Sequence, residues 1–293
     1  MTKPASSPHV GLALGSGGAR GFAHLVILEA FDELGVRPAM IAGSSMGALL
    51  GAAYAGGAPA ADIKALVEEI YGSRDGRLLG FIMRREFFKY VDLIDPTLDS
   101  SGLMRGEKFV NFLLGRIAAT TFADLAIPFV AVATDFWRRK AKAFDRGPLA
   151  RALKASMAAP VIFTPETIDG TVYVDGALSN PVPWDLVAES CDVTVAVNVM
   201  EVDPPPMTTK IDFATVLAEQ MDSLTQALVD ERRRHLPPDI YVAPRLHDIT
   251  AFDFFKVRQI YAQTLPLKEK FKRDLDKLLT GTPSPSRRKK PSA

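Results

Sequence analysis

The sequence predicts an α/β fold with a mostly parallel central sheet, and two observations carry this prediction. Five short apolar runs have the length and composition of buried strands, at residues 10–14, 40–42, 129–134, 193–199 and 240–242. Segments with helical spacing of apolar residues lie between several of these runs, as expected for parallel strands covered by helices on both faces. The chain has 293 residues, of which 47% are hydrophobic, so we expect one large core in a single three-layer α/β/α domain.

The expected helices alternate with the strands near the N-terminus and gather again near the C-terminal end. They cover residues 23–34, 46–54, 61–70, 221–234 and 265–279. The first stops at Gly35, a residue type favoured just past a helix, and the second begins directly after a strand.

Three segments fall outside this alternation. Residues 1–9 form a short polar extension, and residues 281–293 are rich in proline and basic residues, so this tail is expected to be disordered. Residues 72–109 carry apolar clusters among basic residues without strand alternation. We interpret them as an inserted cap, which would be either an ordinary helical layer or a lipid-facing surface. The predicted domain, with this cap, spans residues 10–280.

Charge, cysteine content and the terminal sequences narrow the classes of function. The net charge of +1 gives no reason to expect a nucleic-acid partner, and the single cysteine, Cys191, is expected to pack at the start of a strand. Without a secretory signal or an apolar run of roughly 18 residues, the chain is expected to be cytoplasmic, with or without peripheral attachment to the inner membrane face. The basic excess from Lys268 onward predicts weak contact with an anionic membrane, a solubilising tail being the equal alternative. The oligomeric state is left open.

The strongest local signal is Gly43-Ser44-Ser45-Met46-Gly47, between the second strand and the helix after it. This is the form of a nucleophile elbow, a strained turn that needs small neighbours such as Gly43 and Gly47. The pattern occurs by chance in many chains, and its strand-to-helix context is what favours Ser45 as a nucleophile.

A glycine-rich loop follows the first strand, with the sequence Gly15-Ser16-Gly17-Gly18-Ala19-Arg20-Gly21. Consecutive backbone N–H groups can converge there on an anion, at the positive end of a helix. A dinucleotide-binding loop would require glycine where Arg20 stands, and a purely structural turn is the weakest of the three interpretations. Together with Ser45, the loop makes better sense as an oxyanion hole.

A serine nucleophile needs a base, and five residues are candidates. His9 precedes the first strand, at the end opposite the expected site, and His24 would fix the glycine loop or cap local backbone groups. His235 and His247 are expected on the surface, although the late position of His247 would fit the order nucleophile, acid, histidine. Asp175 ends an apolar strand before a glycine, where spacing alone favours a simple β-turn.

Three motifs taken together carry a family resemblance that favours Asp175 over the histidines as the base. They are Gly-Ser-Gly-Gly-Ala-Arg-Gly-Phe-Ala-His at 15–24, Gly-Ser-Ser-Met-Gly at 43–47 and Asp-Gly-Ala at 175–177. In this order they resemble the motifs of the patatin-like phospholipases, and most of all those of the short bacterial members. The blocks at residues 133–135, 155–160 and 180–183 are also similar to that family, so the resemblance runs from about residue 10 to the C-terminal helices.

The resemblance implies a patatin-like fold and a Ser–Asp dyad in which the carboxylate contacts the serine without an intervening histidine. Carried over, Ser45 is the nucleophile and Asp175 is the base of a reaction that passes through an acyl-Ser45 intermediate. The implied oxyanion loop contains Gly15, Gly17, Gly18 and Ala19, with Arg20 adding positive charge nearby. Ala177 departs from the second glycine that many members have at this position.

The implied substrates are phospholipids, lysophospholipids or other lipid esters, and no metal or other cofactor is implied. Two alternatives stay open. One is a regulatory or scaffold protein that keeps this fold for binding partners, and the other is a nucleotide-binding α/β protein, which Arg20 weakens. The presence of both Ser45 and Asp175 argues against a loss of catalysis.

Overall fold

The computed structural model describes residues 8–71, 115, 119–159, 163–201 and 213–280. Its centre is an eight-stranded sheet in the order β5-β6-β3-β2-β1-β7-β8, with β4 paired to β3. The strands are β1 (Val10–Leu14), β2 (Met40–Ser44), β3 (Phe129–Asp135), β4 (Lys140–Phe144), β5 (Glu166–Ile168), β6 (Thr171–Asp175), β7 (Val193–Val197) and β8 (Ile240–Val242). Strands β3, β2, β1, β7 and β8 pair in parallel, whereas β4, β5 and β6 pair antiparallel, which confirms the mostly parallel sheet.

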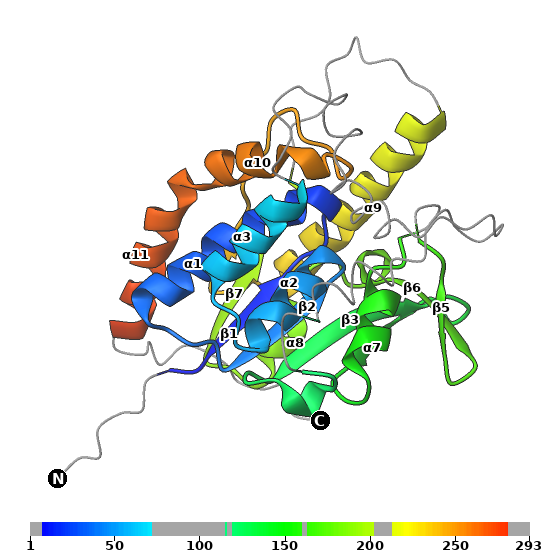
Figure 1. Ribbon diagram of the computed structural model, residues 1–293, viewed down its shortest axis with the longest axis horizontal. Helices are drawn as coiled ribbons and strands as arrows, with labels where there is room; N and C mark the ends of the chain where they lie inside the picture. Colours follow the sequence, from blue (N-terminus) through cyan, green and yellow to red (C-terminus); the bar gives the residue numbers. More distant parts are fainter. Residues whose placement is uncertain (1–7, 72–114, 116–118, 160–162, 202–212, 281–293) are drawn as a thin grey trace.

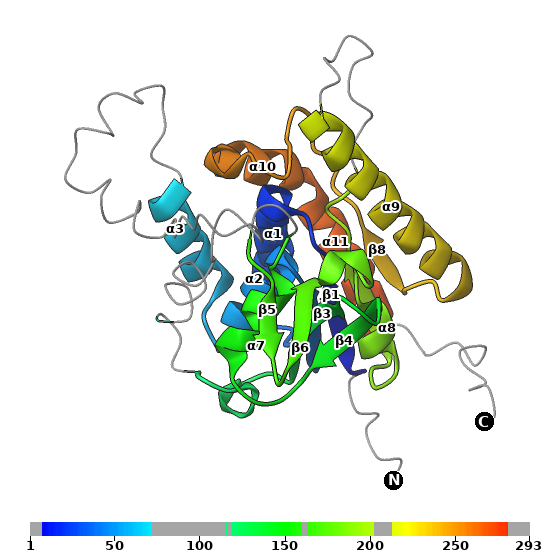
Figure 2. The same ribbon diagram turned by 90° about the vertical axis from the view of Figure 1, so that its right-hand side faces the viewer.

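Helices form the two outer layers. The α-helices are α1 (His24–Leu34), α2 (Met46–Ala55), α3 (Ala60–Tyr71), α7 (Leu149–Ser156), α8 (Trp184–Ala188), α9 (Phe213–His235), α10 (Val257–Thr264) and α11 (Pro266–Thr280), and the short 3₁₀ turns are η1 (Gly18–Ala23), η2 (Phe122–Asp124), η3 (Gly176–Leu178) and η4 (Phe254–Lys256). Helices α8 and α9 lie on one side of the strands and α1, α2 and α3 on the other (Figure 1, Figure 2). The three-layer α/β/α architecture is therefore confirmed.

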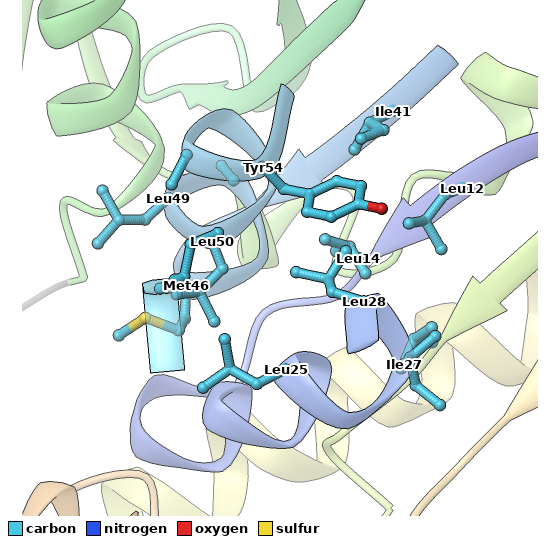
Figure 3. Packing of buried hydrophobic residues seen from close by; sticks show 14 of the residues in the cluster. Leu12, Leu14, Leu25, Ile27, Leu28, Ile41, Met46, Leu49, Leu50 and Tyr54 are labelled. Carbon is cyan, nitrogen blue, oxygen red and sulfur yellow. The ribbon is translucent and has the colours of Figure 1, made fainter. Parts of the chain in front are cut away.

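Side-chain size differs between the two faces of the sheet. Leu12 and Leu14 point into the larger core, where they meet the aliphatic residues of α1 and α2 (Figure 3). On the other face, Ala13 and Ala196 lie under the fully buried Trp184 of α8. Alternate residues of a strand point to opposite faces, so small residues on one face admit a large ring without disturbing the other core.

Several elements differ from the sequence expectation. The strand expected to reach residue 199 ends at Val197, and the helix expected from residue 221 begins at Phe213. Strand β4 was not expected, because its alternating Lys and Ala residues are exposed and give no apolar run. Cys191 is buried just before β7, as expected. The predicted cap at residues 72–109, the tail at 281–293 and most of the N-terminal extension lie outside the described residues. Within the described residues, no helix has the length and apolarity needed to cross a bilayer.

Candidate active site

Ser45 stands in a strained turn between β2 and α2. Its backbone has φ 52° and ψ −122°, a conformation that costs a non-glycine residue about 1–3 kcal/mol. Hydrogen bonds hold the turn in place. The Ser45 carbonyl accepts from the amides of Ala48 (2.9 Å) and Leu49 (3.1 Å), and the Ser45 amide donates to Ser156 Oγ (2.9 Å). These hydrogen bonds therefore hold the strained Ser45 at the N-terminus of α2.

Close backbone packing explains the glycines on either side of Ser45. A Cβ atom on Gly47 would lie 2.2 Å from the carbonyl oxygen of Leu14 and 2.5 Å from that of Gly15. A Cβ atom on Gly43 would lie 2.5 Å from the Cα of Ala48. Both positions thus require glycine so that α2 can start against β1 and the glycine-rich loop.

The sheet register brings Asp175 to Ser45 across 130 positions of sequence. Strand β2 pairs with β3 so that Ser44 lies opposite Val132, which places Ser45 level with the next residue, Ala133. On the antiparallel side of β3, Ala133 pairs with Asp175 at the end of β6. As a result, Ser45 Oγ donates a 2.7 Å hydrogen bond to Asp175 Oδ2.

The Asp175 carboxyl is buried and held on several sides. Its Oδ1 accepts from the Ala177 amide (2.8 Å), its backbone amide donates to the Ala158 carbonyl (2.9 Å), and its carbonyl accepts from Thr134 Oγ1 (2.8 Å). Burial raises the pKa of Asp175 from 3.8 to about 6, although the hydrogen bonds from Ala177 and Ser45 act in the opposite direction. The carboxylate is therefore a stronger base than a solvated aspartate while still ionised at neutral pH.

Two of the predicted oxyanion-loop amides are occupied by backbone carbonyls. The Gly15 amide donates to Val197 O (3.0 Å), and the Ala19 amide donates to Ala251 O (2.8 Å). These bonds anchor the loop to β7 and to the segment before α10. The Gly15 and Ala19 amides are consequently unavailable to a substrate oxygen.

Two other amides of the loop remain available. Among the described residues, no acceptor takes the N–H of Gly17 or Gly18. Gly18 has φ 54°, and a Cβ atom there would lie 2.4 Å from Ala251 O, so the loop depends on glycine at this point. These two neighbouring amides are the donors that an oxyanion could use.

Arg20 is engaged away from this position. Its Nη1 donates to Asp222 Oδ2 on α9 (2.8 Å), and its Nε donates to the carbonyl of Ile249 (3.1 Å). The guanidinium is nearly buried, and Asp222 offsets its charge. Arg20 therefore links the glycine-rich loop to α9 and to the segment around Ile249. The sequence had instead suggested that Arg20 places positive charge near the substrate.

The histidines take structural or surface positions. His24 is fully buried and its Nε2–H donates to the Gly15 carbonyl (2.8 Å), so its predicted role in fixing the loop is confirmed. Burial lowers the pKa of His24 to about 4, which keeps it neutral. His9 pairs with Asp192, and His235 with Glu231. The His247 amide donates to Gln263. Throughout the described ranges, neither Ser45 nor Asp175 hydrogen-bonds a histidine.

Sequence reasoning missed Ser156 as part of this site. The residue is fully buried at the end of α7, and its hydroxyl accepts the hydrogen bond from the Ser45 amide. The only sequence signal was the block at 155–160, which carries no nucleophile pattern of its own. As for metals, no group of three or more His, Cys, Asp and Glu residues that could hold an ion is found in the described part of the chain.

Fold and site together define an α/β protein with a serine at a strand-to-helix turn and a buried aspartate beside it. The family model described as Patatin-like phospholipase matches residues 12–188, and the chain belongs to this family.

Relatives agree with this assignment, and one solved structure shares the fold. An NTE family protein of Mycobacterium tuberculosis (strain H37Rv) is 37% identical over 194 residues, which cover 66% of this chain and 49% of the relative. Lysophospholipase nte1 of Neurospora crassa is 25% identical over 281 residues, covering 86% of this chain and 17% of that protein. The structure of VipD from Legionella pneumophila aligns with a TM-score of 0.52 at 16% identity, covering 92% and 69% of the two chains, and it shares the fold. The chain spans about half the length of the mycobacterial relative.

Proposed function

We propose that this protein hydrolyses carboxylic esters of phospholipids, lysophospholipids or related lipids. The observation that carries the proposal is the 2.7 Å hydrogen bond from the strained Ser45 hydroxyl to the buried Asp175 carboxylate. Membership of the patatin-like phospholipase family and the similarity to a lysophospholipase support a lipid as the acyl donor.

In the first half-reaction, Ser45 Oγ would attack the ester carbonyl carbon as its proton passes to Asp175 Oδ2. The negative charge that develops on the carbonyl oxygen would accept hydrogen bonds from the Gly17 and Gly18 amides, and each such donor contributes about 3 kcal/mol in comparable enzymes. Collapse of the tetrahedral intermediate breaks the ester C–O bond, and the leaving alcohol takes the proton from Asp175. The product is acyl-Ser45.

The second half-reaction would return the serine. Water loses a proton to Asp175 as its oxygen attacks the acyl carbon, and the tetrahedral intermediate uses the same two amides. The fatty acid then leaves and Ser45 Oγ regains the proton. In this mechanism His24 does not react. It holds the Gly15 carbonyl and thereby the shape of the loop.

A serine-directed fluorophosphonate probe tests the nucleophile. We expect it to label Ser45 and to block hydrolysis of p-nitrophenyl esters and phospholipids, while chelators leave hydrolysis unchanged. Ser45→Ala should abolish labelling. Ser44→Ala is the matched control, because the neighbouring Ser44 hydroxyl is buried and has no hydrogen-bond partner among the described residues.

Persistent labelling of Ser45→Ala, read out by mass spectrometry of the modified peptide, would refute the assignment. A folded wild-type protein that neither reacts with the probe nor cleaves any ester of the panel would favour the regulatory or scaffold alternative.

A further inference from the structure

Two aromatic side chains are exposed where β3 turns into β4. Residues 136–142, here named the β3–β4 tip, begin with Phe136, which is 46% exposed, and Trp137, which is 77% exposed. Their rings pack edge to face with centroids 4.8 Å apart. A largely exposed tryptophan that packs against an exposed phenylalanine leaves apolar surface in contact with water, and a partner surface could cover it.

Four basic side chains lie just after these rings in the sequence. Arg138, Arg139, Lys140 and Lys142 follow directly and are all exposed. Arg138 pairs with Asp135 (2.9 Å), whereas the other three form no ion pair with any residue the structure describes. The tip therefore combines aromatic rings with exposed cations, of which Lys142 lies 5.6 Å from the Phe144 ring centroid and helps Arg146 to lower the pKa of Asp145.

Backbone amides of the tip donate hydrogen bonds that hold it in place. The Arg139 amide donates to the Asp135 carbonyl (2.8 Å), the Arg138 amide to Asp135 Oδ1 (2.9 Å), and the Phe136 amide to Val172 O on β6 (3.0 Å). A surface that is already ordered loses little conformational entropy when it binds.

The tip also lies at the same edge of the sheet as the candidate active site. The register places Ala133 level with Asp175, and Phe136 follows three residues further along the chain, roughly 10 Å at the rise of an extended strand. A flat partner that meets the tip would thus lie near the mouth of the site.

We propose that the β3–β4 tip docks onto the surface of an anionic lipid bilayer. Trp137 would enter the interfacial layer, where tryptophan is favoured, while Arg139, Lys140 and Lys142 would face the headgroup phosphates. Exposed cations that follow an exposed tryptophan in sequence fit such a surface better than a neutral protein patch. The choice of a lipid surface rests on the proposed function, but binding can be measured without turnover.

The two tryptophans make the test direct. Trp184 is fully buried and gives a constant background, so the exposed Trp137 reports on the tip. Ser45→Ala protein is mixed with vesicles of phosphatidylcholine, with or without phosphatidylglycerol. We expect the anionic vesicles to shift the emission to shorter wavelength and brominated lipids to quench it. Trp137→Phe should remove both effects.

Sedimentation with the same vesicles measures binding. Lys140→Glu/Lys142→Glu should weaken partitioning at least about tenfold, since each basic residue near an anionic surface contributes about a factor of five. The matched control is Arg273→Glu/Lys277→Glu on α11, which packs beside β8 at the other end of the sheet and should have little effect. Circular dichroism confirms that each variant folds.

Three results would overturn the proposal. They are an emission unchanged by anionic vesicles, an equal loss of binding in the tip and α11 variants, and binding that disappears only when residues 281–293 are removed. Normal vesicle binding by a wild-type protein that hydrolyses no ester would instead refute the proposed function and leave the docking surface intact.

Discussion

The Asp175 side chain accepts a hydrogen bond from Ser45, and its burial raises its pKa, which makes the carboxylate a stronger base. Asp175→Asn keeps the size and the hydrogen-bonding positions but removes the basicity. We expect the turnover of a p-nitrophenyl ester to fall at least about a hundredfold, as for the loss of a general base, while circular dichroism is unchanged. Single alanine variants of His9, His235 and His247 serve as controls and should remain active. An inactive, well-folded His247→Ala beside an active Asp175→Asn would point to a conventional triad.

The raised pKa of Asp175 sets the expected pH dependence. In the proposed mechanism the carboxylate is the active form, so kcat/KM should rise with pH and level off above the pKa of about 6. A solvated aspartate, with a pKa near 3.9, would instead reach its plateau by about pH 5. The rate of Ser45 labelling by the fluorophosphonate, followed between pH 4 and 8, should trace the same curve. A profile that is flat down to pH 4.5 would contradict the assignment of Asp175 as the base.

At the scale of elements, the site depends on how closely α2 approaches β1. A methyl group on Gly47 would overlap the carbonyl oxygens of Leu14 and Gly15, which are backbone atoms that cannot rotate away. We expect Gly47→Ala to lower the free energy of unfolding by several kcal/mol and to abolish Ser45 labelling. Gly56→Ala is the matched control at the other end of α2, where φ is −72°, and should be tolerated. Urea unfolding measures the free energy of unfolding of both variants. Equal stability of Gly47→Ala and Gly56→Ala would show that the close approach of α2 to β1 does not require glycine at position 47.

Local patterns were enough to predict β1, β3 and β7, because each is an apolar run buried on both faces. These patterns failed for β4, because its alternating Lys and Ala residues are exposed and it is held by its antiparallel pairing with β3. Helix α7 was also not assigned, although its last residue, Ser156, holds the Ser45 amide.

The same limit applies to the candidate site. Ser45 and Asp175 lie in compact motifs, and the sheet register then explains their contact. The partners of the glycine-rich loop could not be predicted, because Asp222 and Ile249 contact Arg20 from more than 200 positions away. Only the tertiary arrangement distinguishes the available Gly17 and Gly18 amides from those that are occupied.

For the whole molecule, two buried groups have opposite effects on acid stability. The pKa of Asp175 is raised from 3.8 to about 6, so its ionisation costs stability as the pH rises through this interval, about 3 kcal/mol in all. The pKa of His24 is lowered from 6.5 to about 4, so its protonation costs a similar amount as the pH falls through that interval. Between pH 4 and 6.5 one cost replaces the other, so the changes in stability with pH largely cancel.

Asp175→Asn should separate these two contributions. Asparagine can still accept from Ala177 and donate to Ser45, but it carries no buried charge, so at pH 7 the variant should be more stable than the wild type by up to about 3 kcal/mol. At pH 4 the Asp175 carboxyl of the wild type is largely protonated, and the difference should nearly vanish. Stability of the variant would then fall on acidification more steeply than that of the wild type, because His24 acts alone. Urea unfolding at pH 7, 5.5 and 4 measures both slopes, and a gain that stays constant across this range would show that burial of the Asp175 charge is not its source.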